Sequence, residues 1–168
     1  KKGQLELQGS STVSSPTVFE AIGDLPDLGA FAELIDSDAV KLKPQIVGRL
    51  NKNASPYVRR LRGLDQDRDD RSYPREWDPS VLSSSLRTVH TEESISRFER
   101  TVPGEVEGTS RFLRLDPQGL CNTLRAGTGS ERGAYTSPRP IHPHLARVIS
   151  VREAARLHSF PDWFRFHE

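Results

Sequence analysis

The chain has 168 residues, of which 34% are hydrophobic and 28% are charged, and its formal net charge is only +1. This length allows one domain, or one domain and a piece of another, with a core of modest size. The sequence has no apolar run of about 18 residues and no secretory signal, so it predicts no membrane span. The single cysteine excludes an intrachain disulfide and fits a reducing compartment, so we expect a cytoplasmic protein.

Charge is distributed unevenly along the chain. Residues 1–110 carry 15 basic and 18 acidic side chains, whereas residues 111–167 carry nine arginines, no lysine and four acids. Guanidinium groups form paired hydrogen bonds to phosphate and to guanine, so an arginine-rich half favours contact with nucleic acid. A solvated basic face gives the same pattern, and the charge alone does not decide between the two.

Residue spacing predicts three helices in the first hundred residues. One begins at Thr17 and has an apolar face made of Val18, Ala21, Ile22 and Leu25. A short helix is expected around residues 31–35. A further helix is expected from Thr91 to Arg100, with acids near its start and arginines near its end. Residues 50–75 are expected to form a loop.

From residue 110 the pattern changes to that of β-strands. Residues 111–115 predict one strand and residues 121–126 its partner, because Asp116-Pro-Gln-Gly119 has the residues of a type I turn. Residues 127–143 hold three glycines and three prolines and predict a long loop. The elements together predict an α+β chain with a small, irregular β unit and flanking helices.

The strongest local pattern lies in residues 147–166. Ser150 and Glu153 have the spacing of a capping box, and Ile149 can pack on Ala154 as a hydrophobic staple. The aromatic residues that follow the helix should be buried. On spacing alone this is a capped amphipathic helix of a kind found in proteins of every function. Its apolar face is expected to contain Val151, Ala154, Ala155 and His158.

The residue identities in this block, residues 147–166, are more specific than the spacing of its apolar residues. The string Arg-Val-Ile-Ser-Val-Arg-Glu-Ala-Ala-Arg-Leu-His-Ser-Phe-Pro-Asp-Trp-Phe, residues 147–164, resembles the ninth conserved block of DNA cytosine-5 methyltransferases. Thr-Val-Phe-Glu-Ala-Ile-Gly-Asp-Leu-Pro, residues 17–26, is similar to the segment that follows the eighth block in the same family. The two resemblances occur in the family's order and support each other.

The resemblance implies a division of the chain into three parts. Residues 1–28 would end the catalytic domain, residues 29–146 would form the target-recognition domain, and residues 147–168 would form the ninth-block helix, which returns to the catalytic domain. The implied fold is a fragment of a larger Rossmann-like methyltransferase. The residues expected to dock the two domains are Arg147, Arg152, Glu153 and Arg156.

The blocks that the family uses for chemistry are absent. The chain has no Phe-x-Gly-x-Gly cofactor block and no Glu-Asn-Val block, and Cys121 follows Leu120, where the family's nucleophile follows proline. We therefore expect no catalytic or cofactor-binding residue here, an inactive chain, and S-adenosylmethionine used only by the whole enzyme. His142 and His144 lack a nearby cysteine or acid, so we expect a turn histidine and no metal site.

The chain also lacks methionine, even at position 1. We therefore expect an internal segment of a longer protein, a processed product or an excised piece. The catalytic half would then be missing from this chain or supplied by a second polypeptide.

The resemblance places DNA contact in the recognition domain. Recognition domains of the family share a Thr-(Leu/Ile/Val) dipeptide, which Thr123-Leu124 matches. The Thr123 hydroxyl would contact a phosphate beside a flipped cytosine, because the backbone must be held while the base leaves the stack. A plain strand threonine is the alternative. The loop that follows offers further groups for phosphate or guanine, and the expected contacts are Arg125, Arg132, Ser137 and Arg139.

These features predict the recognition part of a bacterial DNA cytosine-5 methyltransferase of a restriction–modification system. Its partners would be double-stranded DNA and a catalytic half on the same or a separate polypeptide, and no membrane. One alternative is a non-enzymatic DNA-binding module derived from such a domain. A weaker alternative is a protein–protein adaptor, whose affinity for duplex DNA would depend little on salt. The sequence does not specify the recognised DNA site.

Overall fold

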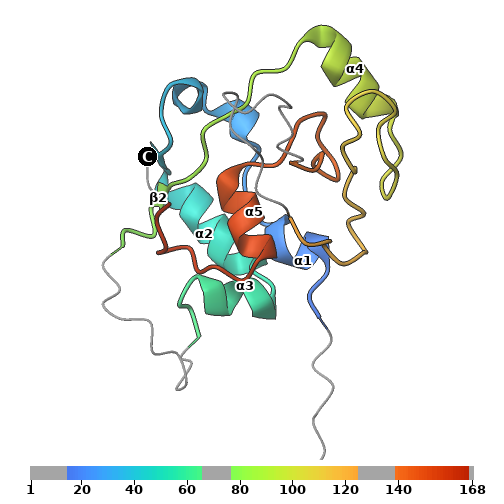
Figure 1. Ribbon diagram of the computed structural model, residues 1–168. Coiled ribbons are helices and arrows are strands. Elements are labelled where there is room, and N and C mark those ends of the chain that lie inside the picture. The colour runs from blue at the N-terminus through green and yellow to red at the C-terminus, as the bar shows by residue number, and fades with distance from the viewer. Residues whose placement is uncertain (1–14, 66–76, 125–138, 167–168) are drawn as a thin grey trace, which may run out of the picture.

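The computed structural model describes residues 15–65, 77–124 and 139–166 (Figure 1). In this part of the chain short helices accompany one two-stranded sheet, so the fold is mixed. None of the described helices has the length and apolar content needed to cross a membrane. The elements are α1 (Val18–Ile22), the 3-10 helices η1 (Leu28–Ala30) and η2 (Ala32–Ile35), β1 (Val40–Lys41), α2 (Pro44–Asn53), α3 (Pro56–Leu61), β2 (Val81–Leu82), α4 (Glu92–Arg100) and α5 (Val151–Leu157).

Side-chain caps start three of the predicted helices. Thr17 caps α1, Thr91 caps α4 and Ser150 caps α5, each by accepting a hydrogen bond from a backbone N–H of the first turn. In α1 and α5 a glutamate three residues later completes the capping box. These three helix starts are therefore confirmed.

Helices α1 and α5 pack against each other, although they lie near opposite ends of the described chain (Figure 1). Ile149, just before α5, is fully buried, and Ala154 packs against the core cluster that contains it, which is consistent with the predicted staple. Burial of this apolar surface stabilises the join between the two ends. The core cluster that they share contains Val18, Ala21, Ile22, Leu115 and Ile149.

A second core cluster forms around the sheet, where β1 and β2 pair antiparallel with Val40 opposite Leu82. The loop predicted for residues 50–75 was wrong at its start, because α2 continues to Asn53 and α3 follows. The Ser55-Pro56 pair is a helix start signal that outweighs the polar residues around it. The cluster contains Leu28, Leu34, Val40, Leu42, Leu50 and Leu82.

The hairpin predicted from residues 111–115 and 121–126 was wrong as far as the chain is described. The turn itself forms, because the Gly119 N–H donates to the Asp116 carbonyl at 3.1 Å. The residues after it form no strand up to position 124, and positions 125 and 126 lie outside the described residues.

The segment that the hairpin should have paired finds a different partner, Ile141. The Ile141 N–H donates to the Leu113 carbonyl at 2.8 Å, and the Leu115 N–H donates to the Ile141 carbonyl at 3.0 Å. Ile141 is fully buried in a third cluster with Phe98 and Val148, whereas Leu120 after the turn stays exposed. Residues 111–115 therefore pair with Ile141, which buries apolar surface, and not with the segment that directly follows the turn.

The buried face of α5 also differs from the prediction. Val151 is 40% exposed, whereas Arg152, Glu153 and Arg156 are buried beside Ala155. The aromatic residues after the helix were predicted to be buried, yet Phe160 and Phe164 are exposed. Burial of charged groups requires hydrogen-bonding partners, and the side chains of Arg152, Glu153 and Arg156 have them.

Arg156 lies at the centre of a buried charge network. Its guanidinium donates to both oxygens of Asp162, at 2.9 and 2.8 Å, and to Asp24 after α1. Arg62 after α3 donates to the same Asp162 at 3.2 Å. Burial by itself would raise the pKa of Asp162, but the charges of Arg156, Arg152 and Arg62 outweigh it and hold the pKa below its usual value. The network joins α1, α3 and α5.

Replacing Asp162 by alanine is expected to destabilise the fold by about 3–5 kcal/mol, because two buried guanidinium groups lose the carboxylate that they share. Asp65→Ala is the matched control. Asp65 pairs with Arg59 at the surface, where both side chains are 42% exposed, so its loss should change stability little. Urea denaturation measures both variants, and equal losses would contradict the role given to the network.

Candidate nucleic-acid interface

Two of the five residues predicted to contact DNA lie in the described part of the chain. Thr123 is exposed and Arg139 is half-buried. Arg125, Arg132 and Ser137 lie outside the described residues. The geometry of the interface is therefore built from Thr123, Arg139 and the residues around them.

Thr123 lies beside a small hollow of about 250 Å³, which Arg111 also lines. The N–H of the next residue, Leu124, donates to Nε2 of His158 at 3.3 Å and so ties this segment to the end of α5. Thr123 is not in a strand, so the alternative of a plain strand threonine does not apply. An exposed hydroxyl and a guanidinium at one hollow can both donate to an anionic oxygen.

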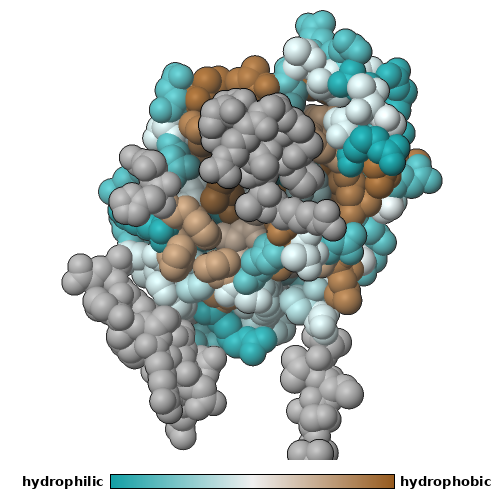
Figure 2. All heavy atoms as spheres, viewed as in Figure 1, coloured by the Kyte–Doolittle hydropathy of each residue, from teal (hydrophilic) through white to brown (hydrophobic). Residues whose placement is uncertain are grey.

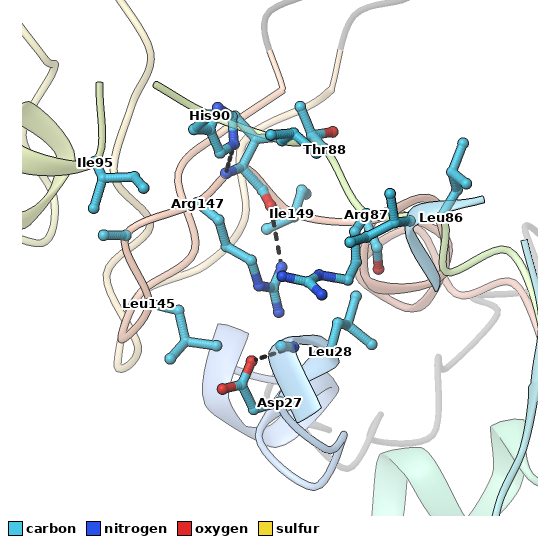
Figure 3. Close-up of a pocket in the computed structure, with 16 residues that line it drawn as sticks. Asp27, Leu28, Leu86, Arg87, Thr88, His90, Ile95, Leu145, Arg147 and Ile149 are labelled. Carbon is cyan, nitrogen blue, oxygen red and sulfur yellow. Dashed lines mark hydrogen bonds between the residues drawn. The ribbon is translucent and has the colours of Figure 1, made fainter. Parts of the chain in front are cut away.

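Arg139 contacts a segment that the sequence did not single out. Its Nη2 donates to Oγ1 of Thr88 at 3.0 Å. Thr88 belongs to residues 86–90, which follow β2 and lie beside residues 145–150, just before α5 (Figure 3). Together with residues 27–29 these segments line a hollow of about 420 Å³, which we call the arginine pocket.

Two arginines of the arginine pocket differ in their partners. Arg147 is neutralised, because its terminal nitrogens donate to both oxygens of Glu153 at 2.8 and 2.7 Å. Arg87 pairs with no carboxylate in the described part of the chain, and its guanidinium makes only one long bond, 3.5 Å, to the Phe31 carbonyl. The guanidinium of Arg87 therefore remains without a carboxylate partner among the described residues, although Asp27 also lines the pocket.

The pKa of His90 is lowered by burial and by positive charges around the same pocket. Burial lowers the pKa of His90, and the charges of Arg139 and Arg147 lower it further. The ring is therefore neutral at pH 7, and its Nε2 accepts the Val148 N–H at 3.2 Å. Sequence reasoning missed His90 and Arg87, because no local spacing indicates that residues 86–90 meet residues 145–150.

The residues predicted to dock the catalytic domain make their described contacts within this chain. Arg147 pairs with Glu153, and Arg156 belongs to the buried network. Arg152 donates to the backbone carbonyls of Ser83 and Phe164 at 3.2 and 2.9 Å. These bonds fix α5 and the tail on the rest of the chain.

The C-terminal block forms an aromatic face made of the exposed Phe160 and Phe164 and the half-buried Phe166. Their ring centroids lie 5.1, 5.4 and 4.9 Å apart, and Phe164 is 43% exposed. An apolar hollow beside the face is lined by Phe160 and Phe166 with Val151 and Leu124. Brown, hydrophobic residues reach the surface in several places in Figure 2.

His142 fixes the turn between Ile141 and α5 through hydrogen bonds of its ring. Its Nδ1 accepts hydrogen bonds from the N–H groups of His144 and Leu145, each at 3.1 Å. Its Nε2 lies 3.6 Å from an oxygen of Glu153. The turn role predicted for this histidine is confirmed by these bonds.

Comparison with known proteins decides the family. The model of the C-5 cytosine-specific DNA methylase family matches residues 24–168. The chain belongs to this family. The resemblance to this family is therefore confirmed, and the match contains residues 147–164 and the last three residues of 17–26.

Relatives of this methylase chain include two curated Type II methyltransferases. M.XorII of Xanthomonas oryzae pv. oryzae (strain KACC10331 / KXO85) is 56% identical over 151 residues, which cover 90% of this chain and 34% of that protein. M.AgeI of Thalassovita gelatinovora is 32% identical over 91 residues, which cover 50% of this chain and 21% of that protein. The chain thus spans about a third of the length of M.XorII.

A solved structure also matches this methylase chain. It is a prophage-encoded protein of E. coli described as a DNA modification methyltransferase. It is 43% identical with a TM-score of 0.44, and the match covers 52% of this chain and 22% of that one.

The fold of this methylase chain is expected to lose up to about 3 kcal/mol through His142 as the pH falls. Burial lowers the pKa of His142 from 6.5 to about 4, against the opposing charge of Glu153. Between these two values the unfolded chain binds a proton that the folded chain does not, so stability is lost as the pH falls through this window.

His142→Asn is the comparison, because it keeps an acceptor near Nδ1 and removes the titration. Chemical denaturation across the window in both proteins isolates the histidine from the carboxylates. The variant should lose less stability, and parallel pH profiles would contradict the assignment.

Proposed function

We propose that this chain is the DNA target-recognition part of a cytosine-5 DNA methyltransferase of a bacterial restriction–modification system. The family match over residues 24–168 carries the proposal. The Type II names of the two curated relatives support the restriction–modification setting. The exposed Thr123 beside Arg111 supports a contact to the phosphate next to a flipped cytosine.

In this proposal the whole enzyme transfers a methyl group from S-adenosylmethionine to C5 of the flipped cytosine, and this chain supplies recognition. Cysteine attack on the base requires a thiolate. The Cys121 Sγ donates to the Asn122 carbonyl at 3.1 Å, and burial raises the pKa of its thiol, so Cys121 stays protonated. The chain alone is therefore expected to be inactive.

S-adenosylmethionine would bind to the catalytic part of the enzyme. The cofactor carries a positive sulfonium, and the arginine pocket of this chain presents the positive guanidinium of Arg87, which pairs with no described carboxylate. Like charges in a partly buried site repel, so this pocket does not fit the cofactor. No step through the cofactor is assigned to the present chain.

The packing of the chain ends supports the proposed domain layout. Residues 1–28 and 147–168 would belong to the catalytic side, and residues 29–146 would form the recognition domain. The described parts of the two end segments share one core cluster, as expected if both belong to the same domain, and Leu115 of the proposed recognition domain joins the same cluster. The chain would then be a fragment of a larger Rossmann-like enzyme that acts on double-stranded DNA in the cytoplasm.

The catalytic part would dock on the aromatic face, Phe160, Phe164 and Phe166. The predicted docking residues Arg152 and Arg156 are buried within this chain, so they act by orienting α5. Clustered exposed aromatic rings mark a surface that is covered in the assembled protein. The chain spans 34% of M.XorII, so two thirds of such an enzyme remain to supply the cover.

Thr123→Val is expected to reduce methyl transfer about 10- to 100-fold, because one hydrogen bond to a charged phosphate is lost while the shape is kept. The assay combines the chain with a polypeptide that carries the missing family blocks, such as the remaining part of M.XorII, and measures methyl transfer to duplex DNA. Thr109→Val is the control, because the described structure gives this exposed threonine no side-chain hydrogen bond.

The same assay tests the proposed function as a whole. Restored methyl transfer with the unaltered chain supports it. Duplex binding without any methyl transfer would favour the non-enzymatic module instead, and no salt-dependent duplex binding would favour the adaptor.

Replacing both Phe160 and Phe164 by serine should weaken assembly with the catalytic polypeptide at least about tenfold, because exposed apolar area no longer becomes buried. Phe19→Ser is the control, since Phe19 is also half-exposed but lies on α1, outside the aromatic face. Sedimentation of the mixed polypeptides measures assembly. Unchanged assembly in the double variant would remove the aromatic face from the proposal.

A further inference from the structure

We propose that the arginine pocket binds a phosphodiester group of the DNA backbone, at a second place besides Thr123. The inference rests on the proposed function and adds a contact that the sequence did not indicate. Its centre is Arg87, and Thr88, which also lines the pocket, accepts a hydrogen bond from Arg139 of the neighbouring hollow.

Arg87 is held in place while its charged group remains available. Its backbone N–H donates to the Leu34 carbonyl at 2.7 Å, which fixes the main chain at this position. Its side chain has one weak bond, at 3.5 Å to Phe31, and no carboxylate partner in the described residues. A guanidinium carries five donors, so most of those on Arg87 are free to bind an anion.

Arg147 adds a second guanidinium to the same space, as Figure 3 shows. Glu153 neutralises its terminal nitrogens, but its Nε is buried and has no hydrogen-bond partner. A buried donor without a partner is costly. An anion between Arg87 and Arg147 would balance the charge of the first.

The carboxylates around the pocket do not pair with Arg87. Asp27 lines it, but its Oδ1 accepts the Gly29 N–H at 2.9 Å and caps η1. Asp38 lies in the neighbouring hollow, where it accepts the backbone N–H groups of Ser84 and Leu86. Asp27 and Asp38 are therefore engaged with backbone donors, and Asp36, which also lines the neighbouring hollow, pairs with neither Arg87 nor Arg139 in the described structure.

The surroundings fit a nucleic-acid backbone better than a small free anion. Leu86 is 48% and Val89 76% exposed, which gives the charged pocket an apolar rim suited to a sugar. Thr88 and Arg139 connect the pocket to the neighbouring hollow, which both also line. Arg139 is itself a predicted DNA contact, so one strand passing it would continue into the pocket.

The test measures duplex DNA binding of the full chain by fluorescence anisotropy at several salt concentrations. Arg87→Ala should bind about tenfold more weakly, and the slope of log K against log salt should become shallower by about one, as for one lost phosphate contact. Arg49→Ala is the matched control, because Arg49 is an exposed arginine of α2 that lines none of these hollows, and it should change neither quantity.

Arg87→Lys keeps the charge and serves as a second variant, since it should retain the salt slope and bind less tightly than the native chain. Circular dichroism melting identifies a variant that fails to fold, in which case the lysine variant decides.

Inorganic phosphate at constant ionic strength separates the two sources of a phosphate group. If it displaces DNA from the native chain but not from Arg87→Ala, DNA and phosphate compete for the pocket, as proposed. If phosphate binds the native chain through Arg87 but leaves its DNA affinity unchanged, the pocket takes a free anion, and the proposal is overturned. Native-like binding and slope in Arg87→Ala would overturn it as well and leave the proposed function standing. If the native chain binds no duplex even at low salt, the proposed function fails and the pocket proposal fails with it.

Discussion

The buried pairing of Arg156 with Asp162 and Asp24 holds the described chain together. Arg156 is fully buried, and its two acids come from the segment after α1 and from the tail after α5. Burying such charges is costly unless each finds a partner with good geometry, so the network tolerates few alternative arrangements. It complements the apolar cluster that α1 and α5 share, which supplies area but little directional preference.

The same network decides what the C-terminal block presents to its surroundings. Arg152 and Arg156, which the sequence predicts to dock the catalytic domain, are enclosed by the chain's own carboxylates and carbonyls. Their direction fixes α5 with Val151 and the aromatic face toward solvent. His158 at the end of α5 accepts a hydrogen bond from the backbone N–H of Leu124. The short helix α5 therefore positions both the segment that contains Thr123 and the aromatic face.

Two groups of arginines on this chain have different consequences. Arg62, Arg152 and Arg156 lie in the interior and serve stability. Arg87 and Arg139 pair with no described carboxylate and line hollows at the surface. The second group is available to phosphate, as is Arg111 beside Thr123, because a guanidinium that already has a carboxylate partner must give it up before it can bind another anion. The near-zero net charge of the chain hides this division.

The sequence by itself determined the features that depend on neighbouring residues. Local geometry or local residue identity determines the caps at Thr17, Thr91 and Ser150, the Asp116–Gly119 turn and the family blocks. Tertiary structure alone decided that Ile141 and not the adjacent segment pairs with Leu113, that α5 buries its charged face, and that Arg87 meets Arg147. Those outcomes depend on burial and charge pairing between segments far apart in the chain, and such pairings leave no period or spacing in the sequence.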